Sequence, residues 1–206
     1  MQPVDMPKNS LSQTVYENLL NKFLQNQLVP GNLLNRREIA LELGVSVAPV
    51  LEALVQLEME GFVESIPRKG TLVRAVQRED VFGQLMLREA MECQAARLYC
   101  GEAVRANRPQ LASIAQELEM TLPDTPEHWK LEIAFHGELV ALSDCLALVR
   151  EFNRFIRLGV FYRLNRVIEP DDRLERLSHV QLLDLLTTDD PDRAERAIRD
   201  HLRSGK

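Results

Sequence analysis

Three histidines and one glutamate are the residues of this sequence whose types and spacing point most clearly to chemistry. Glu132 and His136 stand four positions apart in a helical segment, so they share one helix face with Cβ atoms about 6 Å apart. His179 and His201 lie in two later helical segments, and folding can bring all four groups into one bundle interior. Imidazole and carboxylate ligands suit divalent ions such as zinc, nickel, manganese or iron. We therefore predict a divalent-metal site, with zinc favoured, formed by Glu132, His136, His179 and His201.

Any one of these histidines taken alone is read more simply as a core or helix-surface residue. The prediction depends on three of them occurring together beside a carboxylate. The fourth histidine, His128, is expected on the surface. The three cysteines are odd in number and form no CxxC pair, which indicates reduced thiols in a cytosolic protein: Cys93, Cys100 and Cys145.

Composition and charge indicate a globular protein and exclude several other classes. The chain has 206 residues, 45% hydrophobic and 27% charged, which is typical of a globular protein with one large domain or two small ones. Its formal net charge is −6, with −1 in residues 1–76 and −5 in the remainder, which argues against a general polyanion binder. No apolar run approaches the roughly 20 residues of a membrane span, and the N-terminus lacks a secretory signal. We expect a cytoplasmic protein that is not bound to a membrane.

The elements that position these residues differ between the two halves of the chain. Residues 11–28 have helical spacing, followed by a short helix capped by Asn35 and ended by Gly44, and by a third helix capped by Ser46 and closed by Gly61. The apolar spacing of this third helix predicts a buried stripe of Val50, Leu54 and Leu57, with Ala53 beside them. Two β-prone runs, 62–66 and 71–73, then flank a turn with the sequence PRKG. Three helices followed by a hairpin with a basic tip are the order of a winged helix-turn-helix.

From residue 78 onward the pattern is helical nearly to the end. Proline, glycine and polar clusters divide it into expected helices at 78–106, 109–121, 126–142, 145–168, 171–187 and 191–203. The predicted fold is mainly α: an N-terminal winged helix-turn-helix at residues 1–76, then an all-helical antiparallel bundle of six or seven helices at residues 77–206.

A family resemblance covers most of the chain. The N-terminal half contains PGNLLNRREIALELGVSVAPVLEALVQLEMEGFVESIPRKGTLV, which resembles the DNA-binding domain of GntR-type bacterial transcription regulators. The C-terminal half contains LMLREAMECQAARLYC, LEIAFHGELVALSDCLALV and LSHVQLLDLLTTDDPDRAERAIRDHL, which resemble the helices of the FCD ligand-binding domain of the FadR subfamily. Together the two resemblances extend from about residue 11 to residue 203.

The FCD resemblance implies the same metal site and adds an effector. The three histidines fall on the FCD metal positions, whereas Glu132 stands where the family usually has aspartate, which displaces the carboxylate or changes its denticity. In FCD proteins the metal accepts the carboxylate of a small organic acid, and a guanidinium is a good second partner for it. The residues expected to bind the effector are Arg88, Asn153 and Arg157.

The DNA-binding half departs from its family at the recognition helix. Where the family commonly has two arginines that contact bases and phosphates, this chain has Val47 and Leu51. The helix start can still hold a phosphate, and valine and alanine at this helix start can contact thymine methyl groups. Either the operator is atypical and A·T-rich, or the domain has drifted towards protein contacts; we favour DNA binding. The expected DNA-binding residues are Arg37, Ser46, Ala48, Arg68, Lys69 and Gly70.

The predicted function is therefore that of a ligand-responsive bacterial transcription regulator, not an enzyme. It would bind a palindromic double-stranded operator as a homodimer, with a metal and a small organic acid in the C-terminal bundle. Two alternatives remain: a metal sensor in which the ion is the signal, and a metalloenzyme, which lacks an identifiable acid or base partner here.

Overall fold

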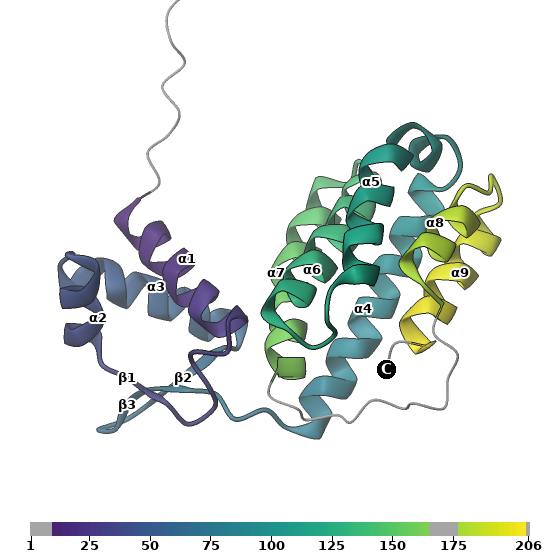
Figure 1. Ribbon diagram of the computed structural model, residues 1–206. Coiled ribbons are helices and arrows are strands. Elements are labelled where there is room, and N and C mark those ends of the chain that lie inside the picture. Colours follow the sequence, from purple (N-terminus) through teal and green to yellow (C-terminus); the bar gives the residue numbers. More distant parts are fainter. Residues whose placement is uncertain (1–9, 165–176, 205–206) are drawn as a thin grey trace, which may run out of the picture. The chain divides into compact units, whose positions relative to one another are not determined.

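A computed structural model describes residues 10–164 and 177–204 of the chain, in two compact units that divide between Ala75 and Val76 (Figure 1). Within these residues the fold is mainly helical, with a winged helix-turn-helix in the first unit and a helix bundle in the second. This confirms the predicted fold class. No helix of the described ranges is both long enough and apolar enough to cross a membrane.

The first unit begins with the three expected helices, α1 (Leu11–Leu24), α2 (Arg36–Leu43) and α3 (Val47–Glu60). Asn35 caps α2 by accepting a hydrogen bond from the Arg37 amide, and Gly44 and Gly61 end α2 and α3 in the left-handed conformation. Helix α1 is shorter than predicted, because the chain turns at Asn26, whose φ is +56°. The hydrophobic spacing persists past the residue at which the helix stops.

A three-stranded antiparallel sheet completes the first unit, with the order β1-β3-β2. Strands β2 (Val63–Ile66) and β3 (Gly70–Val73) form the predicted hairpin, and β1 (Leu33–Leu34) pairs with the other edge of the central strand β3. The sequence did not predict β1, since two residues give no recognisable period.

The core of the first unit lies between α1, α3 and the sheet. Phe23 and Phe62 stack with ring centroids 5.1 Å apart, and the Tyr16 hydroxyl donates a 2.7 Å hydrogen bond to Glu60. The predicted buried stripe of α3 is confirmed, and it consists of Val50, Ala53, Leu54 and Leu57.

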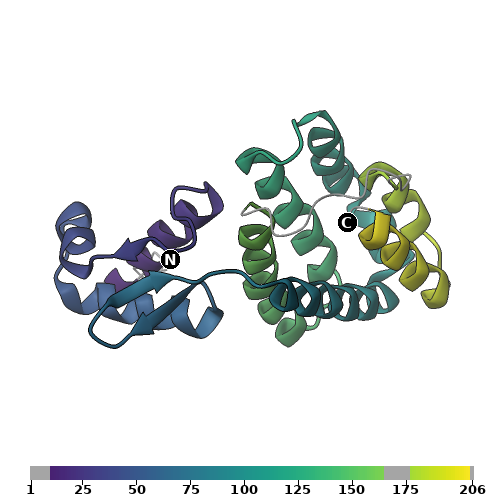
Figure 2. The same cartoon turned by 90° about the horizontal axis from the view of Figure 1, so that it is seen from below.

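The second unit is a bundle whose described helices are α4 (Arg78–Tyr99), α5 (Glu102–Met120), α6 (Pro126–Ala141), α7 (Leu146–Leu164), α8 (His179–Leu186) and α9 (Pro191–Ser204). Helix α4 packs against α6, α7 and α9, so it runs through the middle of the bundle. Helices α8 and α9, drawn yellow-green and yellow, lie side by side at one edge (Figures 1 and 2). A contiguous apolar core joins all six helices.

The break between the first two bundle helices lies earlier than predicted. The chain turns at Cys100 and Gly101, and α5 then continues through Pro109, where the sequence predicts the start of a new helix. Gly101 has a φ of +78°, and a Cβ there would lie 2.2 Å from an Asp189 side-chain oxygen, so only glycine fits. A proline inside a helix costs about 3 kcal/mol. Burial of the apolar face of α5 outweighs this cost.

Helix α8 also begins later than predicted. Ser178 is its N-cap and forms a capping box with Gln181, whereas the sequence placed a helix from residue 171. The remainder of that predicted start, 171–176, and the predicted end of the preceding helix, 165–168, lie outside the described residues.

Candidate functional site

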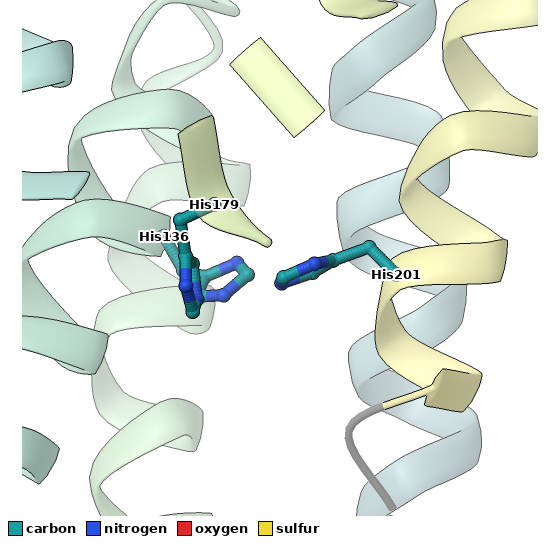
Figure 3. A group of neighbouring side chains, drawn as sticks. All are labelled: His136, His179 and His201. Atoms are coloured by element: carbon teal, nitrogen blue, oxygen red, sulfur yellow. The ribbon is translucent and has the colours of Figure 1, made fainter. Parts of the chain in front are cut away.

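The three predicted histidine ligands come together inside the bundle. His136 on α6, His179 at the first position of α8 and His201 near the end of α9 each offer a ring nitrogen, and these atoms all lie within 4.8 Å of one another. The ring of His201 faces the other two from the opposite side of a small gap (Figure 3). Three ligands that are far apart in the sequence therefore meet at one point.

Glu132, the predicted fourth ligand, lies at the same point. Its two oxygens are 3.4 Å from Nε2 of His136 and 3.2 Å from Nε2 of His179. Burial raises the pKa of this carboxyl, but His179, His136 and Arg88 together hold the pKa well below its ordinary value. Glu132 is therefore ionised, as a metal ligand must be.

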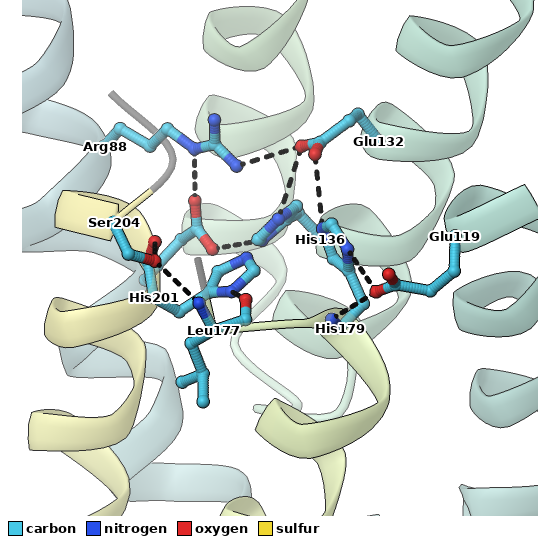
Figure 4. Close-up of polar contacts among 9 residues, drawn as sticks. Arg88, Glu119, Glu132, His136, Leu177, His179, His201 and Ser204 are labelled. Atoms are coloured by element: carbon cyan, nitrogen blue, oxygen red, sulfur yellow. Dashed lines mark hydrogen bonds and ion pairs between the residues drawn. The ribbon is translucent and has the colours of Figure 1, made fainter. Parts of the chain in front are cut away.

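A buried carboxylate that the sequence analysis missed orients one of the histidines. Glu92 on α4 accepts a 2.5 Å hydrogen bond from Nδ1 of His136, and the Nε of Arg88 donates a 2.7 Å bond to its other oxygen (Figure 4). Burial raises the pKa of Glu92, but its interactions with His136 and Arg88 outweigh burial and lower this pKa to about 2. An Nδ1–H that donates to a carboxylate leaves Nε2 as the lone-pair nitrogen, directed at the cluster.

The same tautomer is set at His201 by the backbone. Its Nδ1 donates a 2.9 Å hydrogen bond to the carbonyl oxygen of Leu177, which leaves Nε2 for the cluster. Burial, followed by repulsion from His136 and His179, lowers the pKa of His201 to about 3. The cluster therefore disfavours an added proton on this ring, and a neutral imidazole is the form that binds metals.

Glu119 on α5 contacts both the backbone and the ring of His179. Its backbone amide donates a 2.8 Å hydrogen bond to Glu119, and its Nδ1 lies 3.4 Å from the same oxygen. Since His179 opens α8, Glu119 also satisfies one of the amides that a helix start leaves without an internal partner.

The histidine cluster fits a metal ion. The Nε2 atoms of His136 and His179 are fully buried, and neither makes a hydrogen bond of acceptable geometry, although both lie near Glu132. Buried nitrogens are rarely left in this state. Three nitrogens bound to one ion at about 2.1 Å in tetrahedral geometry lie about 3.4 Å apart, so ligand atoms separated by up to 4.8 Å would move together by about 1 Å to reach one centre. Three imidazoles and a carboxylate are a donor set that could hold a divalent ion.

A cavity of about 260 Å³ opens beside the cluster. Glu132, His179 and His201 line it on one side, and its apolar walls include Leu85, Leu118, Trp129 and Leu202. The size and the mixed lining suit a small organic molecule.

The predicted effector residues divide between this cavity and another part of the bundle. Arg88 lines the cavity, and its Nη2 lies 3.5 Å from Glu132. Asn153 and Arg157 on α7 do not line it; Asn153 lies against Gly137 instead, where a Cβ would come within 3.1 Å of its side-chain oxygen. His128, expected on the surface, is half-buried and lines the cavity beside Trp129. Helix periodicity alone could not distinguish the faces of α6 and α7.

The predicted DNA-binding residues all belong to the first unit. The wing tip exposes Arg68, Lys69 and Gly70, and Arg37 is exposed at the start of α2. Within the described ranges, neither these two arginines nor this lysine makes an ion pair. Ser46 is the N-cap of α3, but its hydroxyl makes no capping hydrogen bond. Ala48 lies in the first turn of α3 and is exposed.

Comparison with known proteins identifies the family of both units. Residues 11–73 match the bacterial regulatory proteins of the gntR family, and residues 84–204 match the FCD domain. The chain belongs to the GntR family. It is a transcriptional regulator with an FCD domain, and its relatives are regulators and not enzymes.

Relatives of this GntR regulator come from several bacteria. It is 34% identical over 158 residues to the Nta operon transcriptional regulator of Aminobacter aminovorans, covering 75% of this chain and 71% of that protein. It is 23% identical over 201 residues to the HTH-type transcriptional repressor RspR of Escherichia coli, covering 95% and 87%. The solved structure of E. coli McbR/YncC has the same fold, with a TM-score of 0.71, 21% identity and 95% of each chain covered.

Proposed function

We propose that this GntR regulator binds a divalent metal ion through His136, His179, His201 and Glu132, and that a small organic acid binds beside the ion and changes operator affinity. The observation that carries the proposal is the meeting of these four groups, two with buried nitrogens that lack hydrogen bonds, at the wall of a cavity. Zinc is favoured, and nickel, manganese and iron suit the same ligands.

The residues around the cluster have separate roles in this proposal. Glu92 and the carbonyl of Leu177 hold His136 and His201 with Nε2 directed at the ion. Glu132 supplies the negative charge, and its longer side chain replaces the aspartate expected from the family resemblance. The bound ion would provide an open coordination position for an effector carboxylate.

Arg88 is the proposed second partner of that carboxylate. Its Nε and Nη2 contact Glu92 and Glu132, and its Nη1 makes no hydrogen bond with the described part of the chain. When Glu132 shares its charge with an ion, its attraction for Arg88 weakens, and the guanidinium can turn to an incoming carboxylate. The apolar walls of the cavity then contact the remainder of the acid.

DNA binding is assigned to the first unit. The proposed contacts are phosphate contacts from Arg37, Arg68 and Lys69, with Gly70 allowing close approach of the wing and with Ser46 and Ala48 at the start of α3. A homodimer would place two such units on a palindromic operator. Large apolar side chains on α4 that are more than half exposed supply a candidate surface for dimerisation: Phe82, Met86 and Leu87.

The decisive experiment measures metal content and ligand binding on the same protein. Purified wild type should contain about one divalent ion per chain, and the triple variant His136→Ala, His179→Ala, His201→Ala should contain none. Calorimetry with small organic acids should detect binding to the metal-loaded form only. Metal content unchanged in the triple variant would overturn the site. Operator affinity that changes with the ion alone and with no acid would instead indicate a metal sensor.

A further inference from the structure

The outward side of α3 carries a row of apolar side chains along its length, beside the exposed polar residues Glu52 and Gln56. Leu51, Val55 and Met59 are spaced four residues apart on this side of the helix. Their exposed fractions are 37%, 55% and 75%. Ala48 is exposed on the same face, one turn before Leu51, and Val47 beside it is 38% exposed. We call these five residues the α3 stripe: Val47, Ala48, Leu51, Val55 and Met59.

The charged residues of α3 do not cover this stripe. Both oxygens of Glu58 are used by Ser65 on β2, through its amide at 2.7 Å and its hydroxyl at 2.9 Å. Glu60 accepts hydrogen bonds from Tyr16 and Gln56. Among the carboxylates of α3, only Glu52 has no hydrogen bond or ion pair in the described part of the chain. The helix contains no lysine or arginine, so the α3 stripe is bordered by no cation of its own helix.

The rest of the first unit indicates what covers the stripe. Arg37, Arg68 and Lys69 are exposed cations with no ion pair among the described residues, and cations of this kind favour a polyanion. An apolar protein partner would cover the stripe without using these charges. The combination of an apolar helix face and cations on neighbouring α2 and the wing is best matched by a DNA major groove.

Only one group on the major-groove edges of the bases suits such a face. Thymine carries an apolar C5-methyl group there, whereas guanine, cytosine and adenine carry no methyl group and are read through their donors and acceptors. A valine or leucine against a G·C pair would strip water from those polar atoms without replacing their hydrogen bonds. We propose that the α3 stripe selects operator positions by contact with thymine methyl groups, with Leu51 and Val55 as the principal specificity residues.

This inference rests on the proposed DNA binding of the first unit, and its test separates the two. Full-length, metal-loaded protein is used to select duplexes from a random library at about 50 mM salt. Each thymine of the selected half-site is then replaced by deoxyuridine, which lacks only the methyl group. Binding is measured by fluorescence anisotropy. We expect half-sites rich in A·T pairs and a loss of about fourfold in affinity for each thymine methyl that touches the stripe and is removed.

A variant pair ties the effect to the helix. In Leu51→Ala the penalty for deoxyuridine at the contacted position should fall to nearly onefold, because the partner of the methyl is gone. The matched control is Leu146→Ala on α7, a leucine that is 85% exposed in the other unit, and it should retain the full penalty. Circular dichroism checks that both variants are folded.

Each remaining outcome is decisive. Selection of G·C-rich half-sites, or equal affinity for thymine and deoxyuridine duplexes, would overturn the inference and leave DNA binding intact. The same holds if Leu51→Ala leaves the deoxyuridine penalty unchanged. Failure to retain any duplex, even at low salt, would overturn the proposed DNA binding itself and would favour a protein partner for the stripe.

Discussion

The histidine cluster and the α3 stripe are two candidate binding surfaces with opposite properties. At the cluster, polar groups are buried and each is positioned by a neighbour, as Glu92 positions His136 and the Leu177 carbonyl positions His201. On α3, apolar groups are exposed and the polar residues are turned aside, as Glu58 is turned to Ser65. Both surfaces differ from what the family resemblance implies, at Glu132 in the cluster and at Val47 and Leu51 in the stripe.

The difference teaches how much a substitution matters in each place. A buried polar site tolerates little change, because every group left without its partner costs about 1–3 kcal/mol. Most substitutions on an exposed apolar face leave the stability of the fold nearly unchanged and alter only which partner the face recognises. We therefore expect changes in the cluster to affect metal binding and folding together, and changes in the stripe to affect DNA preference alone.

The largest effect is expected from removing a ligand. His179→Ala should weaken zinc binding by more than about a hundredfold, since loss of an outer partner alone typically costs ten- to a hundredfold. His179 is 12% exposed, so this variant disturbs packing less than loss of the fully buried His136 would. Competition with a chromogenic chelator measures the affinity. His128→Ala is the control, as His128 lines the same cavity outside the cluster, and equal losses in the two variants would refute the ligand assignment.

Removing the metal should also lower the stability of the fold. At a free ion concentration of about 100 times Kd, binding to the folded form contributes about 2.7 kcal/mol. For a chain of this size that corresponds to a fall in Tm on the order of 10 °C after chelation. Differential scanning fluorimetry with and without chelator, followed by zinc addition, measures it. An unchanged Tm, or a shift that persists in the triple histidine variant, would contradict the prediction.

A smaller effect is expected at the residue that orients a ligand. Glu92→Gln keeps the shape of the side chain and removes its charge, so His136 loses the carboxylate that fixes its tautomer. Metal affinity should fall about ten- to a hundredfold with the stoichiometry unchanged. Glu89→Gln on the same helix is the control, because Glu89 pairs with Arg199 and Arg203 away from the cluster. A variant of Glu92 that binds zinc as tightly as wild type would show that the hydrogen bond is only structural.

The smallest effect on the fold is expected on α3. Leu51→Arg should change the free energy of unfolding by no more than about 0.5 kcal/mol, because at this partly exposed site the aliphatic part of arginine can keep the contacts of leucine while its charged end reaches water. It should nonetheless steepen the salt dependence of DNA binding, by about 0.9 in the slope of log K against log salt for each phosphate that the new arginine neutralises. Titrations at several salt concentrations measure the slope, with Leu146→Arg as control. An unchanged slope would mean that this position does not face DNA.

Local patterns in the sequence determined most of the elements. Caps such as Asn35 and Gly61, and the spacing of the buried stripe on α3, are set by neighbouring residues, and they lie where they were predicted. The histidines could be grouped because their types and spacing match a family. The predictions were wrong where distant segments decide the local structure: the chain turns at Gly101, where the φ of +78° and the neighbouring Asp189 leave no room for a Cβ, and β1 pairs with β3.

The sequence by itself determined the fold class, the family and the types of ligand offered to an ion. Only the tertiary structure decided which helix each apolar face packs against, because helical spacing defines an apolar face but not the helix that covers it. It brought Glu92 on α4 to His136 on α6 and kept Asn153 and Arg157 away from the cavity. Glu58 is also turned away from the outer face of α3, because the hydroxyl and the amide of Ser65 on β2 bind its carboxylate. Leu51 and Val55 therefore stay exposed on that face.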